Sequence, residues 1–314
     1  MSREPNLFVV GAAKAGTTSL YRALAEQRQV FMSPIKELHY YSTDIDRHKF
    51  SREYKETIVF DDHEALRRSK SGRVFSTHMR DRAAYLALFE GADPSRHKYL
   101  GEVSPSYLYS RVAAESISRA SPGAKIVMIL RKPIDRAFSH YLMDVSIGYV
   151  KLGFAACLER ELSSSESCWG RDTQYIALGA YAEQVKRYLD AFPREDVMII
   201  LYDDFAADYR EVLRNLFSFL DIGNPAMPEN RRHNQAQLPR YPRLNYALRR
   251  LYVKKAAKEL VPQEIKRIFK RLYYQKMAMP SPSERERAIV NGALRDDIPR
   301  LGELIGRDLR LWLT

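Results

Sequence analysis

The sequence predicts an α/β protein in which one parallel sheet is covered by helices on both faces. Three short, almost entirely apolar runs lie at residues 6–10 (NLFVV), 125–130 (KIVMIL) and 197–202 (VMIILY). Strands that are apolar on both sides are typical of parallel sheets, because helices cover both faces of such sheets. Each run is followed by a helical pattern, and this alternation indicates the same fold class.

The helices are predicted from apolar residues that recur on one face. Leu20 and Leu24 define a helix at residues 17–26, and Pro133 begins one that runs to about residue 143. Two further apolar stripes, at residues 182–192 and 212–220, come before and after the run at 197–202. With a fourth strand at 98–103, these elements predict a single domain over residues 1–314.

The other segments are predicted to decorate this sheet. Residues 42–97 and 145–175 are polar and irregular, so we expect excursions above the sheet rather than separate domains. The motif SPSE at residues 281–284 resembles a capping box with Pro at the first helical position, and the helix should end before Pro299.

Composition limits the function classes. The 314 residues are 45% hydrophobic and 29% charged, which is ordinary for a globular protein and argues against disorder, collagen or coiled coil. The net charge of +12 indicates an anionic partner. Cys157 and Cys168 are too few for a disulfide framework and lack metal-ligand spacing, so we expect reduced thiols and no metal.

The sequence also predicts where the protein works. It has no run of 18 apolar residues, so no transmembrane helix is expected. The apolar run at residues 7–13 is at the short limit for a signal peptide, and Glu4 stands where a basic region is needed. We expect a cytoplasmic protein, with the inner membrane surface as the alternative.

The first functional motif is the loop GAAKAGTT at residues 11–18, between a strand and a helix. Such a loop offers backbone amides and a helix N-terminus to an anion. It differs from a Walker A motif because Thr17 follows Gly16 where that motif needs Lys, and Lys14 lies inside the loop instead. The alternative is a tight glycine turn with a solvated lysine.

Two further segments carry candidate chemistry. In ILRKPIDRAFSHY, Arg131 follows a strand and Ser139 lies two turns into the next helix, a pattern suited to a second phosphate unless Arg131 pairs with Asp135. In PIKELHYYS, Glu37 and His39 can do general base work, unless the segment is a solvated loop.

Taken together, these segments resemble the sulfotransferases that use 3′-phosphoadenosine 5′-phosphosulfate (PAPS), in the branch that includes heparan sulfate sulfotransferases and many bacterial enzymes. The loop resembles the family's 5′-phosphosulfate loop, and ILRKPIDRAFSHY resembles its 3′-phosphate motif. PIKELHYYS, GEVSPSYL at 101–108, and residues 179–205 and 301–313 continue the similarity. The landmarks occur in the family's order over almost the whole chain.

The resemblance implies a P-loop-like sulfotransferase fold, PAPS as donor, 3′,5′-adenosine bisphosphate (PAP) as product and no metal. By position, Lys14 would stabilise charge on the leaving phosphate oxygen, and Glu37 would be the general base with His39 beside it. Arg131 and Ser139 would bind the 3′-phosphate. The cradle of the 5′-phosphate would be formed by Ala15, Gly16, Thr17, Thr18 and Ser19.

The sequence departs from the family pattern in two places. Val103 stands where glycosaminoglycan 3-O-sulfating members have Lys, which argues against a heparan-type acceptor. The late Lys-Gly-x-x-Gly loop of the cytosolic enzymes is replaced by HNQAQLPRYP at 233–242, where Arg240 is the candidate that closes over the 3′-phosphate. The acceptor stays open among sugar, lipid, polyketide, carrier-bound and phenolic hydroxyls, with an amine less favoured.

Two other function classes are kept open. A P-loop-like kinase or ATPase is the enzyme alternative. A basic surface binder is suggested by residues 231–275, which hold thirteen Lys/Arg and only two acids, nearly the whole net charge. This segment could bind an acidic carrier protein or an anionic membrane, or it could be a helix pair with solvated lysines. No nucleic acid is expected, because no reader motif is present.

Overall fold

The computed structural model describes residues 4–69, 72, 75–164, 168–171, 173–228, 238–250, 274–275 and 280–314. Most of the basic segment predicted at 231–275 lies outside these ranges. Its described part contains helix α12 (Pro242–Arg250) and a short antiparallel pair, β6 (Leu238–Pro239) with β7 (Tyr274–Gln275).

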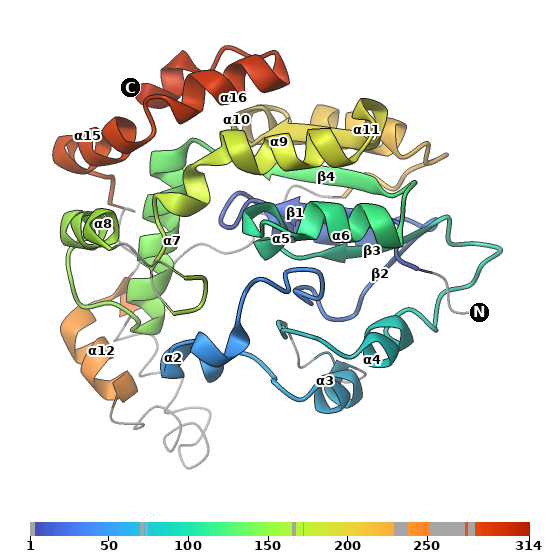
Figure 1. The fold of residues 1–314 in the computed structure, drawn as a ribbon, viewed down its shortest axis with the longest axis horizontal. Coiled ribbons are helices and arrows are strands. Elements are labelled where there is room, and N and C mark those ends of the chain that lie inside the picture. Colours follow the sequence, from blue (N-terminus) through green and yellow to red (C-terminus); the bar gives the residue numbers. More distant parts are fainter. Residues whose placement is uncertain are drawn as a thin grey trace.

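A five-stranded parallel sheet forms the centre of the fold (Figure 1), as the sequence predicts. Its order is β2-β3-β1-β4-β5, so β1 lies between β3 and β4. All four predicted strands are confirmed to within about one residue, and β2 is an edge strand that the sequence analysis missed. The bounds are β1 Leu7–Gly11, β2 Val30–Met32, β3 Tyr99–Val103, β4 Lys125–Leu130 and β5 Val197–Leu201.

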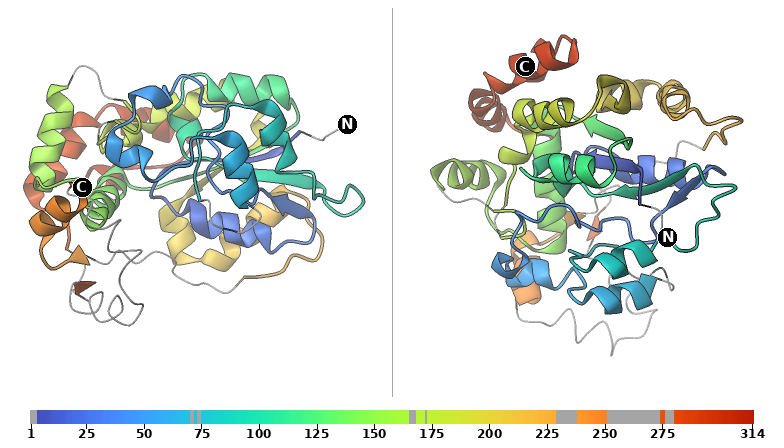
Figure 2. Two further views of the ribbon diagram at one scale, coloured as in Figure 1. Left: turned by 90° about the horizontal axis from the view of Figure 1, so that it is seen from below. Right: turned by 45° about the vertical axis from the view of Figure 1, so that its right-hand side comes forward.

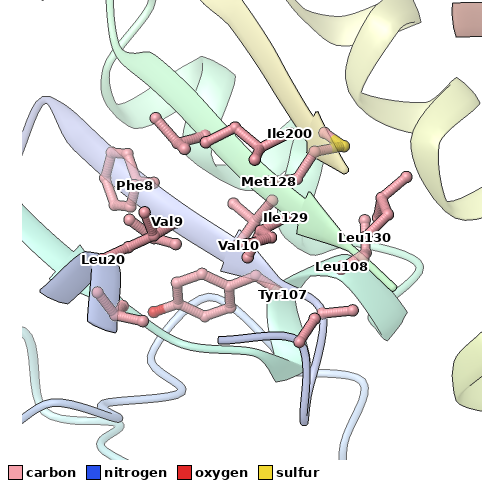
Figure 3. Close-up of a cluster of buried hydrophobic side chains, with 14 of the residues drawn as sticks. Phe8, Val9, Val10, Leu20, Tyr107, Leu108, Met128, Ile129, Leu130 and Ile200 are labelled. Atoms are coloured by element: carbon pink, nitrogen blue, oxygen red, sulfur yellow. The ribbon is translucent and has the colours of Figure 1, made fainter. Parts of the chain in front are cut away.

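The core explains why these runs are strands. Every residue of β1 is buried, and Val9 lies opposite Val103 on one side and Val127 on the other. Figure 3 shows side chains of β1 and β4 packed together, with Leu20 from the first helix on one side. Apolar side chains are therefore needed on both faces of the strand, and the alternation of a half-exposed strand is absent.

Helices cover both faces of the sheet (Figure 2, left), with α1 and α11 on one face and α6 and α9 on the other. The helices that flank the sheet are α1 (Thr17–Ala25), α5 (Ser106–Tyr109), α6 (Ala113–Ala120), α7 (Pro133–Ile147), α9 (Tyr181–Ala191), α10 (Tyr202–Ala207) and α11 (Tyr209–Phe219). The other elements are η1 (Arg47–Lys49), α2 (Arg52–Lys55), α3 (Asp62–Ser69), α4 (Arg82–Ala87), α8 (Phe154–Ser163), η2 (Ala177–Gly179), η3 (Arg194–Asp196), α15 (Glu284–Ala293), α16 (Asp297–Ile305) and η4 (Arg310–Leu313).

Two predicted helix ends differ from the structure. Helix α7 continues one turn beyond residue 143 and stops at Gly148, whose φ of 78° suits glycine. The capping box of α15 is built by Ser283 with Glu286, two residues later than predicted, because Ser283 supplies the N-cap. The predicted end of this helix before Pro299 is confirmed, because α15 stops at Ala293. Pro299 lies in the first turn of the next helix, α16, where a missing amide costs no helical hydrogen bond.

The polar stretch 42–97 folds back onto the segment that follows β2. It contains η1 and α2–α4, which lie below the sheet in Figure 1. Two isolated parallel bridges, Glu37 with Ser76 and Val59 with Thr77, fix this stretch to itself and to the segment that carries the candidate base. Within the described part of the chain, no helix has the length and apolar character needed to cross a membrane.

Candidate active site

The loop between β1 and α1 is shaped for an anion. Gly16 has φ of 103°, a conformation that side chains rarely allow, and a Cβ on it would lie 3.4 Å from the Tyr202 ring. Helix α1 begins at Thr17 with no side-chain cap. The Ser19 amide already donates to the Gly16 carbonyl at 2.9 Å. The amides of Thr17 and Thr18 have no carbonyl one turn behind them, so they are the ones available to an anion.

Arg131 connects this loop to the end of β4. Its Nη1 donates to the carbonyl oxygen of Lys14 at 3.2 Å, and its guanidinium lies 4.7 Å from the centre of the Tyr202 ring. Tyr181 donates its hydroxyl to the Arg131 carbonyl at 3.1 Å. Arg131 is therefore turned towards the loop rather than towards Asp135. The two predicted anion-binding segments are side by side.

The Lys14 side chain is poised for an anion. Its Nζ lies 3.4 Å from the Met143 sulfur of α7, a weak acceptor. Burial lowers the pKa of Lys14, and the nearby Asp144 and Glu37 carboxylates partly offset this. In the part of the chain that the structure describes, Lys14 forms no ion pair within 4.0 Å. An incoming anion would therefore supply its counter-charge.

Glu37 is held between a lysine and a histidine. Its Oε1 accepts from Lys36 Nζ at 2.6 Å, and its Oε2 lies 3.6 Å from His39 Nε2. The solvated-loop alternative is wrong, because only 5% of the Lys36 side chain and 21% of the Glu37 side chain are exposed. The backbone explains this burial: Glu37 donates its amide to the Phe75 carbonyl at 3.1 Å and accepts from Thr77 at 2.8 Å.

The charge state of Glu37 follows from these partners. Burial raises its pKa, but the Lys36 ammonium and the imidazolium form of His39 outweigh burial and hold the pKa of Glu37 at about 2. A carboxylate base with a pKa raised towards neutrality would take a proton more readily. Glu37 is instead fully ionised at neutral pH and weakly basic, so a proton that it takes must be stabilised by its surroundings.

Two buried carboxylates near the site were missed by the sequence analysis. Glu102 of β3 accepts hydrogen bonds from the Tyr85 and Tyr107 hydroxyls, and burial raises its pKa to about 7. Asp144 of α7 accepts from the Tyr175 hydroxyl at 2.7 Å, and burial raises its pKa to about 7 as well. The available signal was a lone acid inside the otherwise apolar segment YLGEV.

The remaining predicted residues are less closely gathered. Ser139 lies on α7, half-buried, two turns after Pro133. Arg240 is exposed and lies over its neighbour Tyr241 at 5.7 Å, directly after β6, which packs against α7. Arg136 of α7 is fully buried and donates to the Tyr175 carbonyl.

The two cysteines, Cys157 and Cys168, are not joined by a disulfide bond. Among the residues given in the structure, no three His, Cys, Asp or Glu side chains are grouped as metal ligands.

The fold is a parallel α/β sheet with a glycine-containing loop between β1 and α1, and comparison with known proteins gives its family. The model of the sulfotransferase family matches residues 5–225, about two thirds of the chain. This chain therefore belongs to the sulfotransferase family.

Individual relatives agree with that assignment. A sulfotransferase from Alicyclobacillus acidocaldarius is 30% identical, covers 99% of this chain and 100% of its own, and superposes with a TM-score of 0.66. Mouse (Mus musculus) carbohydrate sulfotransferase 15 is 24% identical over 79% of this chain and 51% of its own length. Mouse heparan sulfate glucosamine 3-O-sulfotransferase 3B1 is 27% identical over 38% of this chain and 30% of its own length. The chain thus spans about half the length of the carbohydrate sulfotransferase it matches.

Proposed function

We propose that this protein transfers the sulfuryl group of PAPS to an acceptor hydroxyl by in-line displacement. The observation that carries the proposal is the hydrogen bond from Arg131 to the Lys14 carbonyl. It joins a loop suited to a 5′-phosphosulfate to a residue suited to a 3′-phosphate, at the carboxyl ends of the adjacent strands β1 and β4. A donor that carries phosphates at both positions fits this pair.

Each residue of the site has a separate role in the transfer. The acceptor oxygen forms a bond to sulfur while the bond from sulfur to the phosphate oxygen breaks, and PAP leaves. Negative charge grows on that phosphate oxygen, where Lys14 and the first amides of α1 stabilise it. The acceptor hydroxyl loses its proton to Glu37, the ionised carboxylate of the site. Ser139 and Arg131 hold the other end of the donor.

A carbohydrate hydroxyl is the first acceptor to test. Two relatives are named for carbohydrate or heparan sulfate sulfation. The half-buried Trp169 ring lies 6.0 Å from the His39 ring and 6.0 Å from the Tyr109 ring. Aromatic faces next to a base suit the packing of a sugar or phenol ring. Val103 still argues against a heparan-type acceptor.

The proposal is tested with radiolabelled PAPS and a panel of sugar, phenol, lipid and acyl-carrier hydroxyls. Sulfated product from one acceptor class, with release of PAP, supports it. No product from any class, together with hydrolysis of ATP or phosphate transfer from it, would move the protein to the kinase alternative. The same panel decides whether an amine replaces the hydroxyl.

A separate proposal concerns the partners of the basic segment 231–275. It contains Lys254, Lys255, Lys258, Lys266 and Lys270, which lie outside the described residues. We propose that this segment meets an acidic carrier protein or an anionic membrane, since its charge is nearly the whole net charge of the chain. Neutralising these lysines should raise the KM of a carrier-bound or membrane-bound acceptor and leave PAP affinity unchanged. An unchanged KM would mean that these lysines only form a solvated surface.

A further inference from the structure

A chain of hydrogen bonds runs behind Glu37, away from the phosphate loop. His39 is fully buried, and its Nδ1 lies 2.5 Å from the Ser106 hydroxyl oxygen at the start of α5. Ser106 lies 2.9 Å from the Ser42 hydroxyl oxygen, and Ser42 donates to the His39 carbonyl at 3.0 Å. The two serines therefore connect the imidazole ring to the backbone of the same residue.

Counting protons along this chain gives the tautomer of His39. A serine hydroxyl has one proton to donate. Ser42 uses its proton on the His39 carbonyl, so Ser106 must donate to Ser42, and Ser106 can then only accept from the ring. All three hydrogen bonds are satisfied together only when His39 carries its proton on Nδ1. The lone pair of Nε2 then points at Glu37.

The position of the other ring nitrogen is compatible with this count. His39 Nε2 is buried and has no hydrogen-bond partner among the residues that the structure describes. It lies 3.6 Å from the carboxylate oxygen Oε2 of Glu37. A lone pair and a carboxylate that face each other are two acceptors without a proton between them. One proton placed between Nε2 and the carboxylate would give a hydrogen bond between them. The proposed reaction releases one proton from the acceptor hydroxyl.

We propose that Ser42 and Ser106 are positioning residues that hold His39 as the Nδ1–H tautomer, so that Nε2 receives through Glu37 the proton of the acceptor hydroxyl. This inference rests on the proposed function. The O–H bond of the acceptor breaks as its S–O bond forms, Glu37 Oε2 passes the proton on, and His39 becomes an imidazolium paired with the Glu37 carboxylate. The proton returns to water when the products leave.

Burial is the main reason that the neutral form of His39 is favoured before the reaction. Burial lowers its pKa, Glu37 raises it, and Lys36 and Arg80 lower it. Arg80 donates to the His39 carbonyl at 2.9 Å, and the buried His78 ring stacks on the His39 ring at 4.2 Å. A neutral imidazole with its proton on Nδ1 has a lone pair on Nε2 that can accept a proton. The imidazolium formed in this way would lie 3.6 Å from the Glu37 carboxylate oxygen.

The first test needs no acceptor. The protein is labelled with ¹⁵N-histidine, and the His39 resonances are assigned by their loss in His39→Gln. We expect a protonated Nδ1 and an unprotonated Nε2 in the wild type at pH 7.5. Ser42→Ala, which leaves the ring contact in place, frees Ser106 to donate and should shift the population towards Nε2–H. A wild type that is already Nε2–H would overturn the inference.

The second test measures turnover with whichever acceptor the PAPS panel identifies. Ser106→Ala should lower kcat by about tenfold or more, since general base contributions are of this order or larger, with an unchanged Kd for PAP. The control is Ser110→Ala, a buried serine on the same segment that donates to Asp44 at 2.5 Å instead. Equal losses of kcat in both variants would overturn the inference. Failure of the panel would overturn the proposed function and the proton transfer that rests on it. The tautomer of His39 would still stand or fall by the NMR result alone.

Discussion

The carbonyl oxygen of Lys14 accepts a hydrogen bond from Arg131, 117 positions later in the chain. Lys14, which we propose stabilises the leaving phosphate oxygen, is thus held in place by Arg131, which we propose binds the 3′-phosphate. Because the guanidinium also lies over the Tyr202 ring, it is oriented before any ligand arrives. We therefore expect that binding of the 3′-phosphate at Arg131 affects the geometry of the loop that carries Lys14.

The first prediction concerns this coupling. Arg131→Ala should weaken PAP binding by about tenfold or more, since a hydrogen bond to a charged group contributes about 1.5–3 kcal/mol. Calorimetric titration with PAP measures it. Arg310→Ala is the control, because Arg310 is an exposed arginine paired with Asp308. Equal weakening in the two variants would mean that general surface charge, and not Arg131, binds PAP.

Lys14→Ala should nearly abolish turnover, by about a hundredfold or more, because a donor at the developing oxyanion is lost. The fold should survive, because the Nζ contact that is removed is to a methionine sulfur. Initial rates and a thermal melt check both points. Near-normal turnover in a folded variant would remove Lys14 from the proposed mechanism.

Glu37→Gln should lower turnover strongly and leave PAP affinity almost unchanged, because Glu37 faces Lys36 and His39 and lies outside the phosphate loop. Rates and PAP titration separate the two effects. If PAP affinity fell as far as the rate, Glu37 would belong to donor binding or to the fold.

The lowered pKa of Glu37 also predicts how the free energy of unfolding depends on pH. Its pKa of about 2 is below the value of about 4.5 that an unfolded chain would show. Its contribution is therefore present above pH 4.5 and is lost as the pH falls towards 2. Denaturant unfolding at several pH values should show a smaller acid loss in Glu37→Gln than in the wild type. Parallel curves would contradict the ion pair with Lys36.

The raised pKa of Glu102 predicts the opposite dependence of stability on pH. Its pKa of about 7 is above the unfolded value, so its contribution is complete below about pH 4.5 and is lost as the pH rises through 7. Wild-type stability should therefore decline over this range, by up to about 3 kcal/mol from this group. Glu102→Gln should flatten that decline in denaturant unfolding. An unchanged slope would show that Glu102 stays ionised in the fold.

The sequence was enough to predict the sheet because its strands are buried on both faces and so are apolar at nearly every position. It missed β2, whose three residues lie at the sheet edge and are too few to show a pattern. It placed the cap of α15 two residues early because Ser281 and Ser283 offer the same chemistry, and only the backbone of the N-cap distinguishes them.

For the site, the sequence indicated which segments carry chemistry but not how they meet. The Glu37 segment could be predicted as a solvated loop because its burial comes from pairing with residues 75–77, far along the chain. The serines behind His39 lie in two different segments, so their hydrogen bonds become visible only in the fold. Glu102 was hidden for the same reason, since its tyrosine partners come from α4 and α5.

The central claim is that the paired loops of Lys14 and Arg131 bind a nucleotide with 3′ and 5′ phosphates rather than a triphosphate. The most direct measurement is the melting temperature with saturating PAP in the absence of Mg²⁺, beside the melting temperature with ATP and Mg²⁺. Ligand that binds the folded state at about 100 times its Kd stabilises it by about 2.7 kcal/mol, a shift that a melt resolves. The account predicts this shift with PAP and none with ATP–Mg²⁺. A shift with ATP–Mg²⁺ and none with PAP would contradict it.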